Sequence, residues 1–91
     1  MKQNIIIVDF GSQVTKLIAR RIRDFGVFSQ IIPFNRVEKK LFTDTTLGII
    51  LSGGPKSVTT RDAPKIPNFI YDLEIPILGI CYGLQLICKD F

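Results

Sequence analysis

Short apolar runs separated by polar and turn-forming residues dominate the pattern along the chain. Four such runs occupy residues 5–10, 27–34, 47–51 and 75–80. The first is nearly continuous and contains only one charged residue, Asp9, which is typical of a strand buried on both faces of a sheet. Pro33 ends the second run, and Ser52-Gly53-Gly54-Pro55 follows the third. The pattern therefore predicts four strands, the first of them central.

Segments whose apolar residues have the spacing of a helix lie between these runs. Between the first two, apolar residues recur at Val14, Leu17, Ile18, Ile22 and Phe25. Ser12 is placed to cap this helix and Gly26 to stop it, while Lys16, Arg20 and Arg23 fall mostly on its polar side. Shorter helices are predicted at 37–42 and 64–73, although Pro67 limits how regular the second can be. Strands that alternate with helices predict an α/β fold, an open and mostly parallel sheet with helices on both faces.

Composition and charge limit the classes of protein to which this chain can belong. The chain has 91 residues, 46% of them hydrophobic, which suits one small domain or part of one. Its net charge of +4 comes from basic residues spread along the chain apart from Arg20, Arg21 and Arg23, so we expect no nucleic-acid partner. The apolar run at 5–8 is too short for a signal peptide or a membrane span, so we expect a cytoplasmic protein that binds no membrane.

The two cysteines, Cys81 and Cys88, are expected to be reduced thiols. They stand seven residues apart and lack the paired short spacing of a zinc site, so no metal site is predicted. Cys88 lies among apolar residues and is predicted to be a buried structural thiol.

Gly79-Ile80-Cys81-Tyr82-Gly83 has the form of a nucleophile elbow, in which a reactive residue lies on a tight turn between a strand and a helix. Glycines on both sides allow a close approach of the backbone. The amino end of the following helix would favour the thiolate of Cys81 by lowering its pKa. The alternative is a buried thiol with two incidental glycines.

Two further motifs follow predicted strands, and in an open parallel sheet ligand sites gather beyond the carboxyl ends of the strands. The paired glycines of 52–55 could direct backbone amides toward an oxyanion, with the Tyr82 amide as the second donor. A plain turn or a phosphate-binding loop is the alternative for that motif. For Asp9-Phe10-Gly11-Ser12-Gln13, helix capping and packing is favoured over phosphate binding, because the glycine spacing of a dinucleotide site is missing.

The chain contains no histidine. Any Cys–His catalytic pair must therefore be absent or be completed by residues outside these 91.

Three segments together resemble one family. They are residues 9–13 with 18–23, the segment Gly48-Ile49-Ile50-Leu51-Ser52-Gly53-Gly54-Pro55-Lys56-Ser57-Val58, and Leu78-Gly79-Ile80-Cys81-Tyr82-Gly83-Leu84-Gln85. Together they resemble the class I glutamine amidotransferases, and the first two point to the GMP synthase branch. The resemblance runs over essentially all of the chain and implies a flavodoxin-like sheet.

The resemblance also implies site residues and partners. Cys81 would attack L-glutamine, Gly54 and Tyr82 would supply oxyanion-hole amides, Gly53 would shape the loop that holds Gly54, and Gln85 would line the substrate pocket. The released ammonia would pass to an ATP pyrophosphatase domain, where ATP activates xanthosine monophosphate for conversion to GMP. No cofactor is implied within this chain, since ATP and Mg belong to that synthetase domain.

The same resemblance predicts that residues 1–91 are the truncated N-terminal portion of an amidotransferase domain. The family's base, a His two residues before a Glu, lies downstream of the cysteine, as do the synthetase and dimerisation regions. We therefore expect little activity from this chain alone. Its thin core predicts self-association or marginal folding. The alternatives are a noncatalytic module completed by a partner chain that supplies the His and Glu, and a redox sensor that uses Cys81.

Overall fold

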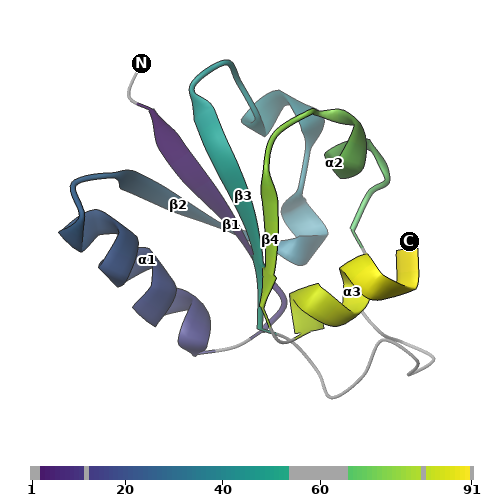
Figure 1. The fold of residues 1–91 in the computed structure, drawn as a ribbon, viewed down its shortest axis with the longest axis horizontal. Helices are drawn as coiled ribbons and strands as arrows, with labels where there is room; N and C mark the ends of the chain where they lie inside the picture. The colour runs from purple at the N-terminus through teal and green to yellow at the C-terminus, as the bar shows by residue number, and fades with distance from the viewer. Residues whose placement is uncertain (1–2, 12, 54–65, 81, 91) are drawn as a thin grey trace.

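The computed structural model describes residues 3–11, 13–53, 66–80 and 82–90. Its centre is a four-stranded parallel sheet in the order β2-β1-β3-β4 (Figure 1). The strands are β1 (Asn4–Asp9), β2 (Phe28–Pro33), β3 (Thr46–Ser52) and β4 (Ile77–Ile80). The four predicted strands are confirmed, and the first lies inside the sheet between β2 and β3.

Helices cover both faces of the sheet, as predicted. Helix α1 (Val14–Asp24) lies on one face, whereas α2 (Phe69–Asp72) and α3 (Tyr82–Asp90) lie on the other (Figure 1). Two single 3-10 turns, η1 (Phe34–Arg36) and η2 (Lys39–Leu41), connect β2 to β3. Strands β1 and β2 are parallel, and α1 between them forms the crossover connection that such a pair requires.

The apolar side chains form one cluster on each face of the sheet. On the α1 face, Ile7, Ala19 and Ile50 are buried together. On the other face the buried cluster comprises Val8, Phe10, Ile49, Leu51, Ile66, Ile70 and Leu86. Alternate residues of β1 and β3 enter opposite clusters, which explains why these strands are apolar between their polar end residues.

Helix α1 ends where the sequence predicts. The Gly26 amide donates to the Arg23 carbonyl at 2.9 Å, and Gly26 has a φ of +82° that suits glycine. Ser12 lies outside the described residues, and Gln13 at the N-cap makes no side-chain capping bond. The apolar stripe is only partly buried, since Leu17 is 58% and Phe25 is 85% exposed.

The two shorter helices differ from prediction. Residues 37–42 do not form one helix, because Val37 is extended and packs with Phe42 against the core on the α3 face. Of the helix predicted at 64–73, only Phe69–Asp72 is helical, and Glu74 follows it at a positive φ of 59°. Residues 64 and 65 lie outside the described part. In both places packing of apolar side chains outweighs local helical preference.

The prediction that Cys88 is buried is wrong, because its side chain is exposed. Leu86, two positions earlier in α3, is buried. Two positions along a helix correspond to a rotation of about 200°, so Cys88 lies on the side away from the sheet. Among the described residues, no helix has the length and apolar character needed to cross a membrane.

Candidate functional site

The carboxyl ends of the strands meet at one edge of the sheet. Asp9 is the register partner of Pro33 in β2 and of Ser52 in β3, and Ser52 is the partner of Ile80 in β4. The two motif-bearing strands therefore end side by side, as the sequence predicts. Anything that follows Ser52 and Ile80 begins at the same level of the sheet.

Gly53 directly follows β3 and is buried, with a φ of +80°. A residue with a side chain is strained in this conformation, so the turn out of β3 requires glycine here. The role of Gly53 in shaping the loop that follows it stays a prediction, since residues 54–65 lie outside the described part. Gly54, the predicted oxyanion donor, lies outside the described residues.

Cys81 also lies outside the described residues, but the elements on both sides of it are described. Strand β4 ends at Ile80 and helix α3 begins at Tyr82, so the predicted strand and the predicted helix are present on either side of Cys81. Tyr82 and Gln85 belong to α3, the first at its first position and the second one turn later. Their side chains are not among those described, so their predicted contacts with substrate remain predictions.

Gly83 explains how α3 can start so near the sheet. A Cβ atom at this position would overlap the carbonyl oxygen of Leu51 and would lie 2.6 Å from the Leu51 Cβ. Real Cβ atoms do not approach other atoms so closely, so only glycine allows this contact. The close approach expected from the elbow motif is thus confirmed for Gly83.

The loop after β1 is held by the side chain of Asp9. Its Oδ1 atom accepts hydrogen bonds from the Gly11 amide at 2.8 Å and from the Thr15 hydroxyl at 2.9 Å. Thr15 is fully buried in α1, and the Phe10 amide donates to the Ser52 carbonyl at 3.0 Å. These bonds fix the entry into α1 and support a packing role for residues 9–13.

Sequence reasoning missed two features of this edge. Thr15 was not identified as a partner of Asp9, although a threonine on the first turn of a helix after a carboxylate is a recognisable pairing. Ser52 is fully buried, and its Oγ atom has no hydrogen-bond partner within the described part of the chain. No sequence signal distinguishes such a serine from one that is satisfied.

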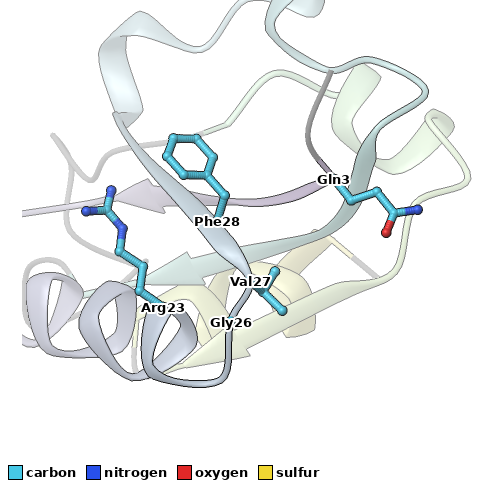
Figure 2. Close-up of a pocket in the computed structure, with 5 residues that line it drawn as sticks. All are labelled: Gln3, Arg23, Gly26, Val27 and Phe28. Carbon is cyan, nitrogen blue, oxygen red and sulfur yellow. The ribbon is translucent and has the colours of Figure 1, made fainter.

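A separate pocket of about 460 Å³ lies at the opposite end of the sheet. Its lining residues are Gln3, Arg23, Gly26, Val27 and Phe28 (Figure 2). Gln3 precedes β1 and Val27 precedes β2, so this pocket is at the amino ends of the strands. It therefore takes no part in the site formed after Ser52 and Ile80. The described residues contain no group of three His, Cys, Asp or Glu side chains that could hold a metal ion.

Comparison with known proteins identifies the family. The model of the class-I glutamine amidotransferases matches residues 6–91. The glutamine-hydrolysing GMP synthase of Zymomonas mobilis is 52% identical over 90 residues, which is 99% of this chain and 17% of that protein. The corresponding proteins of Nitratiruptor sp. and Finegoldia magna are 55% identical over 87 residues and 47% identical over 89 residues, covering 96% and 98% of this chain.

The chain spans only a small part of these relatives, 17% of the Nitratiruptor protein and 18% of the Finegoldia protein. The family match nevertheless begins within β1 and includes every later element through α3. The parallel sheet, the ends of β3 and β4 at one edge, and this match agree that the chain belongs to the class I glutamine amidotransferase family.

Proposed function

We propose that this chain supplies the cysteine nucleophile and the oxyanion loop of a glutamine-hydrolysing GMP synthase. The observation that carries the proposal is the register pairing of Ser52 with Ile80, which brings together the ends of the two strands that precede Gly54 and Cys81. Identities of 47% to 55% to proteins named as glutamine-hydrolysing GMP synthases support the choice of reaction.

In the proposed reaction the Cys81 thiolate attacks the side-chain amide carbon of L-glutamine. The amide N–H groups of Gly54 and Tyr82 donate to the oxyanion that forms, and such donors are among the strongest contributions to acyl-transfer catalysis. The C–N bond then breaks, the nitrogen takes up a proton, and ammonia leaves. Water hydrolyses the glutamyl thioester to glutamate and restores the thiol. Gln85 would line the pocket that holds the substrate.

The proton transfers need a base that this sequence does not provide, since it contains no histidine. The amino end of α3 could favour the Cys81 thiolate, but it cannot move protons. General acid and base catalysis contributes about 10²-fold to 10⁴-fold to such reactions. We therefore expect negligible glutaminase activity from these 91 residues alone.

The acceptor of the ammonia would be a synthetase part that lies outside this chain. There, an ATP pyrophosphatase domain would activate xanthosine monophosphate with ATP and Mg, and ammonia would displace the adenylate to give GMP. This segment itself would need no cofactor. Xanthosine monophosphate, the substrate of that synthetase domain, is a metabolite of purine biosynthesis, and we propose a cytoplasmic location for the protein.

A second candidate is a noncatalytic module that binds glutamine or is completed by a separate chain with the His and Glu. Under this candidate the His and Glu that these 91 residues do not provide as a pair come from the separate chain. Under it, the isolated chain would gain activity only when a second polypeptide is added.

A chimeric enzyme tests the proposal. The chain would replace the matching segment of the Zymomonas mobilis GMP synthase, to which it is 52% identical over 90 residues. We expect GMP formation with glutamine as nitrogen source, and its loss in Cys81→Ala, while formation with added ammonia survives. Cys88→Ala removes the exposed thiol and serves as the matched control, with activity retained.

A chimera that uses ammonia but not glutamine would contradict the proposal. The 91-residue chain alone is assayed in parallel, for ammonia release and for labelling by a glutamine-directed alkylating analogue. Turnover that depends on Cys81 without an added chain would show that another group replaces histidine, and the mechanism given above would then be wrong.

A further inference from the structure

A cationic face lies on α1, which covers the face of the sheet opposite α3 (Figure 1). Lys16, Arg20 and Arg23 follow one another at intervals of four and three residues, so they lie on the same side of the helix. With Ala19, Asp24 and Ile31 they line a surface pocket of about 290 Å³ between α1 and β2. We refer to this pocket as the α1–β2 pocket.

Arg23 is held in a fixed orientation at one side of this pocket. Its Nη2 donates to the Ser29 carbonyl at 2.8 Å and its Nε donates to the Ser29 hydroxyl at 3.2 Å. Its guanidinium carbon also lies 5.5 Å from the centre of the Phe28 ring, and Figure 2 shows both side chains beside the turn that joins α1 to β2. A guanidinium fixed in this way needs little further ordering to bind a ligand.

Lys16 and Arg20 have no comparable structural role. Arg21 and Arg23 lie in the last turn of α1, where the helix dipole favours cations. Within the described residues, the side chains of Lys16 and Arg20 have neither an ion pair nor a hydrogen bond. Like charges four residues apart on a helix repel each other. The only carboxylate among the lining residues is that of Asp24, so the α1–β2 pocket keeps a surplus of two positive charges.

We propose that the α1–β2 pocket binds a phosphate group in its doubly charged form. The surplus charge of the pocket matches that of a phosphate or phosphomonoester dianion. Arg20 can donate two parallel hydrogen bonds to phosphate oxygens, and Lys16 adds a third donor one turn earlier. The apolar floor made by Ala19 and Ile31 leaves room for an organic group attached to the phosphate.

Titration of the ¹⁵N-labelled chain with inorganic phosphate, followed by NMR at constant ionic strength, tests this inference. We expect saturable shifts at the amides of Lys16, Ala19 and Arg20. Arg20→Gln should weaken binding about tenfold, as the loss of a charge-assisted hydrogen bond predicts. Arg20→Lys, which keeps the charge but not the paired donors, should weaken it less. Adenosine monophosphate, as a second probe, should bind at least as tightly as phosphate.

Lys39→Gln is the matched control, because it removes one exposed cation from η2 and leaves α1 unchanged. Shifts that fail to saturate, or an equal weakening by Lys39→Gln and Arg20→Gln, would show general charge screening and would overturn the inference. Since Arg20 is exposed, the spectra of its variants should keep the wild-type dispersion. The outcome does not depend on Cys81, so it is independent of the proposed glutaminase function.

Discussion

Gly83 in α3 lies directly against the backbone of Leu51 in β3, in a contact that leaves no room for a Cβ atom. Leu51 is fully buried in the core on the α3 face, so it cannot move aside without disturbing the sheet. The contact fixes how far the amino end of α3 lies from the end of β3. In the proposed enzyme this is the distance between the residues around Cys81 and the oxyanion loop.

Gly83→Ala should lower the free energy of unfolding by at least about 2 kcal/mol. The steric overlap of the new Cβ atom with the Leu51 backbone outweighs the higher helix propensity of alanine. Urea denaturation of both proteins measures the difference. Gly48→Ala is the control, since a Cβ there would lie 3.6 Å from the Pro76 carbonyl oxygen, an ordinary contact. Equal midpoints for Gly83→Ala and the wild type would mean that α3 does not lie as close to β3 as described.

Thr15→Val should lower the free energy of unfolding by about 1.5 kcal/mol, the usual contribution of a hydrogen bond to a charged group. The change keeps the shape of a fully buried side chain and removes only its bond to Asp9. Thr43→Val, which removes the exposed bonds of the Thr43 hydroxyl with the hydroxyl and the amide of Thr45, should change stability by less than about 0.5 kcal/mol. Thermal melts of the two variants and the wild type measure the difference. Equal changes in melting temperature for both variants would contradict a stabilising bond between Thr15 and Asp9.

Ser29→Ala should lower stability and Ser52→Ala should not, although both serines are fully buried. The Ser29 hydroxyl donates to the Ala19 carbonyl at 3.1 Å and accepts from Arg23, so its removal should cost about 1 to 2 kcal/mol. The Ser52 hydroxyl has no partner in the described part of the chain, so its removal should be neutral or stabilising by up to about 1 kcal/mol. A clear loss of stability in Ser52→Ala would indicate that this hydroxyl has a partner outside the described residues.

Leu78→Ser should weaken self-association of the chain, if the exposed side of β4 mediates it. Leu78 is 57% exposed on β4, one of the two edge strands of the described sheet. It lines a pocket of about 240 Å³ with Ile5, Ile50 and Pro76. Parallel sheets normally have both faces covered, and exposed edge strands promote association. Sedimentation velocity over a range of concentrations measures the effect.

Leu47→Ser is the control for this change, because Leu47 is 44% exposed at the start of β3 and does not line that pocket. A wild-type chain that stays monomeric at all concentrations would refute the predicted self-association. Equal effects of the two variants would show that association is not specific to β4.

The sequence by itself determined the strands and the position of the candidate site. Continuous apolar runs require burial on both faces, so residues 5–10 predicted an inner strand, and β1 is one. Motifs that directly follow parallel strands must share one edge of the sheet, so Gly53 and the residues around Cys81 were expected together. The pairing of Ser52 with Ile80 confirms this. These inferences succeed because they depend on local periodicity and on the direction of the chain.

Only the tertiary structure decided which side chains are buried and which partners they find. Leu86 faces the sheet and Cys88 does not, because the orientation of α3 is set by the contact of Gly83 with Leu51. The pairing of Arg23 with Ser29 likewise joins residues whose types alone do not specify partners. Burial and hydrogen bonding depend on how elements pack against one another, and packing is a property of the assembled fold rather than of any local pattern.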